Sequence, residues 1–383
     1  MQYTYHAECI SKGGLLLGII AAAITIGIFI FWSIPVLSAR PKAESRELFS
    51  KVTIIIPARD EEKNIAVLLD SLNKQTEENL EIIVANDQSA DSTAEIAKAK
   101  GAAVLDVPDL PQGWLGKSWA CWQGARQSSK EWLLFIDADT YFEKNGLLRI
   151  LEAFQDQKEG SVLSIHPFHA VKKGYESLSM LFHIVIYGSM GAFHPLQRKL
   201  SSNGAFGQCM IIRKRDYGKF GGHEAIKGRI VENMAFARHV KKQGGKVRCI
   251  SGRHAISMRM YPNGWSELIK GWSKSFASGA GTTSKVSLVL VFIWLTGMFT
   301  FIPAALSSTV SYHWVPILIL YAAAVLQIYT IAVRIGTFSF WHALFFPVHL
   351  LFFAGVFLFS FLQTYLTRNA KWKGRSIAEK EQA

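Results

Sequence analysis

Cysteines and phosphate-binding glycine motifs are scarce in this sequence. Four cysteines are scattered among its 383 residues, with no C-x-x-C spacing, so neither a disulfide framework nor a cysteine zinc site is indicated. This usage suits a reducing compartment. No G-x-G-x-x-G or Walker A sequence occurs, so a bound diphosphate is not held by a glycine-rich loop. A metal ion would have to take the place of such a loop.

Charged residues are absent from three long stretches of the chain. Asp, Glu, Lys and Arg do not occur in residues 13–39, 286–333 or 335–367. A helix of about 20 apolar residues crosses the hydrocarbon core of a bilayer, so we predict one span at Leu15–Leu37. Residues 286–333 can hold two spans with a turn near Ser311–His313, and the third stretch holds one span or a bent re-entrant segment. Very apolar core helices are the alternative.

The first apolar stretch is too long for the h-region of a cleaved signal peptide, so we predict an uncleaved anchor. Four basic residues follow it closely, and the positive-inside rule then places residues 40–285 in the cytoplasm: Arg40, Lys42, Arg46 and Lys51. The C-terminal tail is also basic, which favours an even number of crossings after residue 285. The sequence therefore predicts a multi-pass protein of the cell membrane with its polar part in the cytoplasm.

The net charge of +13 does not by itself indicate a nucleic-acid partner. No motif of a nucleic-acid-binding fold accompanies the charge, and the basic clusters flank apolar stretches. Anionic lipid headgroups and the phosphates of a substrate are simpler partners. We therefore predict a membrane and a phosphate-bearing ligand as partners, and no nucleic acid.

Strand-like and helix-like segments alternate over residues 52–166. The strand-like runs are Val52–Pro57, Leu80–Ala85, Ala102–Val107 and Glu131–Ile136, and the helical patterns between them are Glu61–Gln75, Ser92–Lys100 and Lys117–Ser128. Such alternation predicts an α/β domain with a mostly parallel, Rossmann-like sheet covered on both faces. Further along, Leu178–Phe193 is apolar but short. We interpret it as a helix lying on the membrane surface, with a buried helix as the alternative.

Polar clusters follow three of the predicted strands, at Pro57–Glu61, Asn86–Asp91 and Asp137–Asp139. Because ligands bind at the carboxyl ends of parallel strands, these clusters are expected to share one site. The two carboxylates of Asp137-Ala-Asp139 can hold Mg²⁺ or Mn²⁺ together with substrate phosphates. A solvated surface turn is the alternative. Lys117 can add a positive charge beside the same phosphate, or it can simply face solvent.

Four segments in this order resemble the successive motifs of family-two inverting glycosyltransferases, which have the GT-A fold: Pro57–Glu61, Asn86–Thr93, Asp137–Asp139 and Val231–Asn233. The resemblance covers about residues 50–280. Within that family, three further runs look like the bacterial diaponeurosporenoate glucosyltransferases: Leu110–Ala120, Gly221–Glu224 and Arg259–Tyr261. The resemblance implies transfer of a hexose from a UDP-sugar to a lipophilic acceptor, such as a carotenoid carboxylate. Another lipid acceptor and a catalytically inactive scaffold are the alternatives.

The resemblance also implies a role for each matching residue. Asp87 would contact uracil, and Pro57, Ala58, Arg59 and Glu61 would line the nucleotide. Lys274 would lie near the acceptor and the diphosphate. Asp139 would be the principal ligand of the divalent metal, Asp137 would lie near the ribose or the metal, and His254 is a candidate further ligand. The implied organisation is an anchor at residues 1–39, a GT-A domain at 40–285, membrane segments at 286–367 and a basic tail at 368–383. The GT-A domain divides into a nucleotide-sugar half, 40–166, and an acceptor half, 167–285.

The sequence departs from the family pattern at the position of the general base. The family usually shows Glu-Asp where this chain has Glu232-Asn233, and the aspartate is commonly assigned as the base. Asparagine does not usefully accept a proton, so either Glu232 serves or no base is needed. A carboxylate acceptor, with a reference pKa of about 4, is already ionised at neutral pH. On this hypothesis Asn233→Asp is tolerated or activating.

Overall fold

The computed structural model describes residues 2–38, 41–77, 80–197, 202–229, 231–279, 284–306, 310–367, 371–372 and 375–376. Its α-helices are α1 (Gln2–Ile30), α2 (Glu62–Asn73), α3 (Thr93–Ala99), α4 (Gly116–Gln127), α5 (Gly146–Gln155), α6 (Met180–Ser189), α7 (Lys214–Lys219), α8 (Glu232–Lys242), α9 (Trp265–Gly279), α10 (Lys285–Leu306), α11 (Val310–Ile335), α12 (Phe340–Leu344) and α13 (Phe346–Thr367). Short 3₁₀ helices are η1 (Ala43–Lys51), η2 (Gly174–Ser179) and η3 (Glu224–Ile226). Arg40, counted above in the charge argument, lies outside the described residues, as do Arg368 and Lys373 of the basic tail.

The strands are β1 (Val52–Ala58), β2 (Glu81–Asn86), β3 (Ala103–Asp106), β4 (Trp132–Ile136), β5 (Thr140–Phe142), β6 (Ser161–His166), β7 (Phe168–His169), β8 (Cys209–Arg213), β9 (Lys246–Ser251), β10 (Ile256–Met258), β11 (Lys371–Trp372) and β12 (Arg375–Ser376). Within the described residues, seven of them form one sheet in the order β3-β2-β1-β4-β8-β6-β9. β8 runs antiparallel to β4 and β6, and the other pairs are parallel. The predicted α/β fold with a mostly parallel sheet is confirmed.

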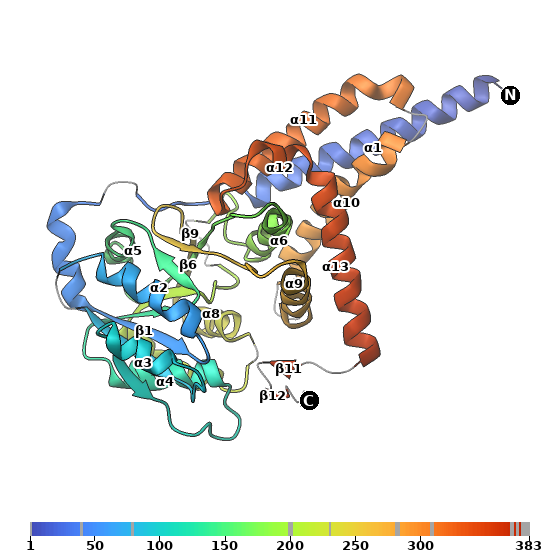
Figure 1. Ribbon diagram of the computed structural model, residues 1–383. Helices are drawn as coiled ribbons and strands as arrows, with labels where there is room; N and C mark the ends of the chain where they lie inside the picture. The colour runs from blue at the N-terminus through green and yellow to red at the C-terminus, as the bar shows by residue number, and fades with distance from the viewer. Residues whose placement is uncertain are drawn as a thin grey trace.

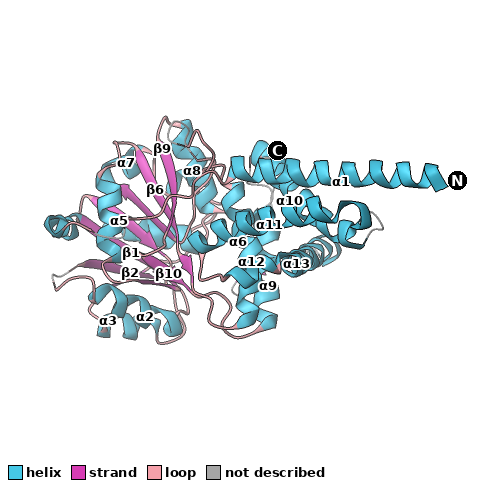
Figure 2. Ribbon diagram, turned by 90° about the horizontal axis from the view of Figure 1, so that it is seen from above, coloured by secondary structure: helices cyan, strands magenta, loops and turns pink. Residues whose placement is uncertain are grey.

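The centre of this sheet is buried because helices cover both of its faces (Figure 2). Successive side chains of a strand point to opposite faces, so Ile54 and Ile56 of β1 join one apolar core and Ile55 joins the other. Ile55 packs on α4, where a side chain in place of Gly124 would meet it at 2.6 Å. Each strand and helix predicted between residues 52 and 136 is present, with its ends shifted by at most two residues.

Four helices of the described residues are long and apolar enough to cross a membrane: α1, α10, α11 and α13. α11 begins at Val310 and includes Ser311–His313, where we predicted a turn, so that prediction is wrong. Three of the four helices follow residue 285. Length and apolar character alone therefore give an odd number of candidate crossings where we predicted an even number.

α6 lies between the sheet and the apolar helices (Figure 1). It contacts α10, α11 and α13, and its residues from Met180 to Ile184 are all buried. The interpretation of this segment as a helix lying on the membrane surface is therefore wrong, and the buried-helix alternative is correct. A helix that is apolar on all sides is covered on all sides, whereas a surface helix keeps a polar face for water.

Candidate active site

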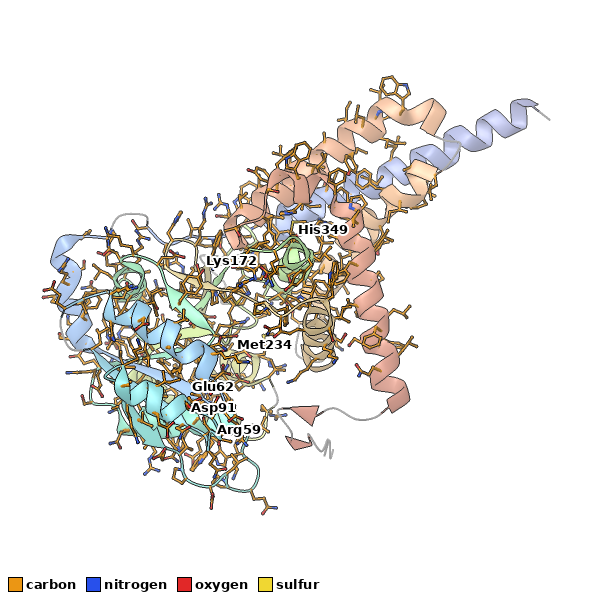
Figure 3. All side chains as sticks on the ribbon, in the orientation of Figure 1. Arg59, Glu62, Asp91, Lys172, Met234 and His349 are labelled. Atoms are coloured by element: carbon orange, nitrogen blue, oxygen red, sulfur yellow. The ribbon has the colours of Figure 1, made fainter. Side chains whose placement is uncertain are left out.

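The loops that follow β1 and β2 are joined by hydrogen bonds from backbone N–H groups to side-chain oxygens. Four of these bonds are Asp60 N to Ser89 Oγ, 3.1 Å; Ala90 N to Asp60 Oδ1, 2.8 Å; Glu61 N to Thr93 Oγ1, 2.8 Å; and Glu62 N to Asp91 Oδ2, 3.1 Å. A longer one runs from Ser92 N to Glu62 Oε2 at 3.4 Å. Figure 3 shows Arg59, Glu62 and Asp91 gathered at this edge of the sheet. Two polar clusters predicted to share a site therefore lie together.

Arg59 and Asp87 form an ion pair between these two loops. Nη1 of Arg59 lies 3.5 Å from Oδ2 of Asp87 and donates to the Asp87 carbonyl oxygen at 3.2 Å. The backbone N–H of Asp87 donates to the carbonyl oxygen of Ala58 at 2.8 Å. The Asp87 residue is only 4% exposed. The sequence placed Ala58, Arg59 and Asp87 around one nucleotide, and the structure brings all three to one edge.

Lys117 connects the end of β4 to the start of α8. Its Nζ lies 2.7 Å from Oδ1 of Asp137 and 3.2 Å from Oε1 of Glu232. The three side chains are 18% to 28% exposed, so they face a cleft and are partly shielded from water. We predicted Lys117 and Asp137 near the same phosphate. The sequence did not reveal that Lys117 also binds Glu232, which lies far away along the chain.

The carboxylates of this cleft repel one another. Burial, followed by the charges of Asp137 and Glu61, raises the pKa of Asp139 to about 6, although water can still reach its side chain. Burial raises the pKa of Asp137 even though Lys117 opposes it. Burial alone would lower the pKa of Lys117, but the charges of Asp137 and Glu232 hold it above its usual range. The cleft therefore has carboxylate charge in excess of what Lys117 neutralises.

The donor set at Asp137-Ala-Asp139 fits a hard divalent cation. Carboxylate oxygens are what Mg²⁺ and Mn²⁺ prefer, and the raised pKa of both carboxyl groups shows that added positive charge would stabilise their ionised forms. Among the described residues, no group of three His, Cys, Asp or Glu side chains could hold a metal by itself. A cation here would depend on ligands from a substrate, as phosphate oxygens provide.

His254 does not lie with the two aspartates. β10 pairs with β5 in antiparallel register, with Met258 opposite Thr140 and Ile256 opposite Phe142. Asp139 precedes one end of this short ladder, and His254 lies beyond the other end. His254 instead lines a separate surface hollow with Arg149 and Arg253. The structure gives no support to His254 as a third metal ligand, because the register separates it from Asp139.

Comparison with known proteins gives concordant matches. A family model described as Glycosyl transferase family 2 matches residues 53–221. The 4,4'-diaponeurosporenoate glycosyltransferase of Staphylococcus aureus strain USA300 is 34% identical over 337 residues, covering 86% of this chain and 89% of that protein. The protein of the same description from strain MRSA252 has the same identity and coverage. The chain belongs to glycosyltransferase family 2.

The fold of this glycosyltransferase is also similar to that of a solved structure. It matches the mannosyltransferase PcManGT from Pyrobaculum calidifontis, solved in complex with GDP-Man and Mn²⁺, with a TM-score of 0.50. The match covers 90% of this chain and 98% of that one at 14% identity. At this identity the likeness shows the GT-A-like fold and nothing more specific.

In this glycosyltransferase, Asn233 and Glu232, where the resemblance implies a general base, both have partners. The side-chain amide of Asn233, in the first turn of α8, donates to the carbonyl oxygen of Ala205. A side chain in place of Gly207 would meet the Asn233 side chain at 3.2 Å. The neighbouring Glu232 points to Lys117. Asn233 therefore fastens α8 to the segment before β8, and Glu232 is ion-paired.

A pocket beside Lys117 and Asp137 also contains residues that we did not predict from the sequence. The pocket is lined by Pro57, Lys117, Cys121, Phe135, Ile136, Asp137, Gly207, Met210, His223, Glu232, Asn233 and Phe236. His223 is buried, its Nδ1 lies 2.7 Å from the Tyr217 hydroxyl, and burial lowers its pKa to about 4. The run Gly221–Glu224 contains this histidine, but nothing in its spacing indicated a pocket. Lys274, predicted near the diphosphate, is exposed on α9 and is not among the residues that line this pocket.

Proposed function

We propose that this glycosyltransferase transfers glucose from UDP-glucose to the carboxylate of a long apolar carotenoid acid of the 4,4'-diaponeurosporenoate type. The observation that carries the proposal is the state of the two residues at the base position. Asn233 cannot accept a proton and donates to the Ala205 carbonyl, and Glu232 is ion-paired with Lys117. An acceptor that is already ionised needs no base. The S. aureus relatives carry the name of such an acceptor.

The donor would bind across the carboxyl ends of β2, β1 and β4. Asp87, held by Arg59, is proposed to contact the uracil, while Pro57, Ala58 and Glu61 line the nucleotide. Lys117 lies 2.7 Å from Asp137, close enough to meet a diphosphate held at the same carboxylate. The hydrogen bonds that join the two loops fix the backbone of this binding edge.

Asp139 and Asp137 are proposed to hold Mg²⁺ or Mn²⁺ together with the donor's phosphates. When bound, the cation neutralises negative charge on the departing nucleoside diphosphate. The residues of the chain orient the reactants: Lys117 adds a fixed positive charge beside Asp137, and the wall at Phe236 and Met210 excludes water from that side of the pocket.

Transfer is proposed to invert the anomeric carbon. One oxygen of the acceptor carboxylate attacks that carbon and forms a glycosyl ester bond, while the bond from the carbon to the UDP oxygen breaks. The electron pair of the broken bond leaves with UDP. No proton is transferred, since the acceptor enters as an anion and the product ester is neutral. Catalysis then rests on positioning and on stabilising the leaving group.

The apolar helices suit an acceptor that resides in a membrane. We propose that residues 40–285 form the catalytic domain on the cytoplasmic side, where nucleotide sugars are made, with α1 before it and the apolar helices after it. α6 joins the two parts, since it packs on the apolar helices and continues the chain of the domain. An apolar acceptor could then reach the cleft without leaving the lipid layer.

The test uses the full chain purified in a neutral detergent. UDP-glucose and Mn²⁺ are supplied with a C30 carotenoid acid, its methyl ester, a polyprenyl phosphate or a ceramide, and products are analysed by mass spectrometry. We expect a hexose added to the free acid alone, in an ester that mild alkali cleaves, and no product with Asp139→Ala. Transfer to polyprenyl phosphate or ceramide, with the acid left untouched, would overturn the proposed acceptor. UDP-glucose that neither binds nor reacts would indicate an inactive scaffold.

A further inference from the structure

Three of the four apolar helices form a bundle. α1 packs along α10 and α11, and the three run side by side away from the sheet (Figures 1 and 2). Where α1 and α10 cross, a side chain in place of Gly297 would meet Ala23 at 2.0 Å, so the backbones approach closely. Gln327 of α11 accepts from the Trp294 ring of α10 and donates to the Ile24 carbonyl of α1, both at 2.9 Å.

α13 lies crosswise to this bundle. In Figure 1 it runs down beside the domain, and in Figure 2 the view is along its axis while α1 lies in the plane of the picture. Its main neighbour is α9 rather than a helix of the bundle. The Ser360 hydroxyl donates to the carbonyl oxygen of Ser273 on α9 at 2.6 Å. The Phe182 ring of α6 lies between Phe353 of α13, at 5.0 Å, and Trp272 of α9, at 4.5 Å.

The free side of α13 is apolar, and α9 separates the other side from water. Leu351, Leu358 and Phe359 of α13 are each about half exposed. The buried Trp272 of α9 packs on Phe182 of α6, while Lys270 and Lys274 of α9 are exposed. A helix without charges cannot lie in water, whereas one shielded by an amphipathic partner can lie at the boundary of headgroups and acyl chains.

We propose that α13 lies along the membrane surface in the acyl layer of one leaflet, below α9, and does not cross the bilayer. If α1, α10 and α11 stand upright in a membrane, a helix crosswise to them lies in its plane. The partner of its exposed apolar side is then the lipid of the leaflet next to the catalytic domain. The chain crosses three times, and the tail after α13 returns to the side of the domain.

The charges of the sequence agree with this arrangement. Lys42 and Arg46 follow α1, and Lys371 and Arg375 follow α13. The positive-inside rule places both clusters on one side of the membrane. A crossing by α13 would separate them, whereas a helix in the plane keeps them together. The even number of crossings predicted after residue 285 is then met by α10 and α11.

Sidedness can be measured with single cysteines in the full chain, after its native cysteines are replaced by serine. Gln2→Cys reports the start of α1, Lys98→Cys the catalytic domain on α3, and Ser376→Cys the tail. Labelling uses a membrane-impermeant maleimide on sealed, uniformly oriented vesicles, before and after permeabilisation. We expect Ser376→Cys to behave like Lys98→Cys and opposite to Gln2→Cys. Agreement between Ser376→Cys and Gln2→Cys would overturn the proposal.

Depth along the helix gives a second measurement that does not depend on the tail. Val348→Cys, near one end of α13, and Phe357→Cys, near its middle, are nine residues apart at exposed positions, and Leu318→Cys and Leu326→Cys are eight residues apart on α11. Such pairs are about 12 to 14 Å apart along a helix axis. Neither pair is placed symmetrically about the middle of the candidate membrane span in its helix. Each site carries a fluorophore, and its depth is read by quenching with lipids brominated at defined positions. We expect similar depths for the α13 pair and clearly different depths for the α11 pair. A depth difference on α13 as large as on α11 would mean that it crosses.

Discussion

The ammonium group of Lys117 lies 2.7 Å from Asp137 and 3.2 Å from Glu232, so one lysine joins two carboxylates from opposite sides of the cleft. Asp137 follows a buried strand, and Glu232 begins a helix nearly a hundred residues later. The position of α8 relative to β4 therefore depends on this lysine as well as on apolar packing.

Replacing Lys117 by methionine should reduce transfer strongly. The change keeps much of the apolar stem but leaves Asp137 and Glu232 unneutralised, and it removes a positive charge beside the proposed diphosphate. We expect kcat/KM to fall by about 10²- to 10³-fold, in the range seen when one stabilising donor is lost. Initial rates with radiolabelled UDP-glucose measure this. Lys117→Arg should retain more activity than Lys117→Met, and equal loss in both would argue against a role of the charge.

Asp139 and Glu232 should differ in their importance. Asp139→Asn removes a proposed cation ligand and should abolish the stimulation by Mn²⁺, with a loss of about 10³-fold, equivalent to roughly 4 kcal/mol. Glu232→Gln should cost less than about tenfold if no base is needed, since a general base usually contributes more than that. Rates are compared at saturating Mn²⁺ and after treatment with EDTA. A Glu232→Gln enzyme as inactive as Asp139→Asn would contradict the mechanism without a base.

Asn233→Asp is now expected to weaken the fold rather than to activate the enzyme. The Asn233 amide donates to the Ala205 carbonyl, and an aspartate would place a carboxylate oxygen against that oxygen. An unsatisfied partly buried polar pair costs about 1–3 kcal/mol, which should appear as a lower Tm in detergent. The control is Asn73→Asp, at an exposed amide that donates to the Lys100 carbonyl at 3.1 Å. Unchanged Tm together with raised activity would restore the sequence-based expectation.

Stability should fall as the pH drops below 6.5 because of three buried histidines. His166, His169 and His183 pack ring against ring, and burial lowers the pKa of His166 to about 3, that of His169 to about 4, and that of His183 well below its usual value. A lowered folded pKa means that the unfolded chain binds more protons below pH 6.5, so the contribution to stability is complete above that pH and is lost beneath it. At pH 5.5 each histidine should destabilise the protein by about 1 kcal/mol.

Thermal unfolding between pH 5 and 8 checks this dependence. His183→Phe removes a group whose two ring nitrogens have no hydrogen-bond partner among the described residues, and it should flatten the pH profile without lowering Tm at pH 8. His239→Gln, on α8 outside the trio, should leave the profile unchanged. If Tm changes with pH as steeply in His183→Phe as in the unaltered chain, His183 is excluded as a source of the pH dependence.

The central strands, and the grouping of their carboxyl ends at one edge of the sheet, were predictable because the sequence patterns that indicate them are local. Short apolar runs that end in polar clusters mark β1, β2 and β4, and parallel neighbours place those ends side by side whatever the rest of the chain does. The charge-free stretches likewise identify the apolar helices from composition alone. These local patterns were therefore sufficient to predict that the strand ends at Ala58 and Asp87 lie together.

Long-range contacts were not predictable in the same way. The pairing of Lys117 with Glu232, the hydrogen bond from Asn233 to Ala205 and the burial of α6 all depend on how distant segments pack. The distance of His254 from Asp139 follows from the register of β5 and β10, which short strands do not encode clearly. A hydrophobic segment as short as α6 has the same appearance whether it meets lipid or protein.

The hydrogen bonds that join the loops after β1 and β2 have a consequence for the affinity of the donor. Backbone N–H groups of Asp60 and Glu61 already have side-chain oxygens as partners, so this edge is ordered before any nucleotide arrives. Ordering a loop at the moment of binding costs conformational entropy, and a loop fixed during folding avoids that loss. The proposed donor-binding edge is therefore preorganised, so binding of the donor should show a small entropic penalty. Changes at Ser89 or Thr93 should weaken nucleotide affinity although neither side chain need touch the nucleotide.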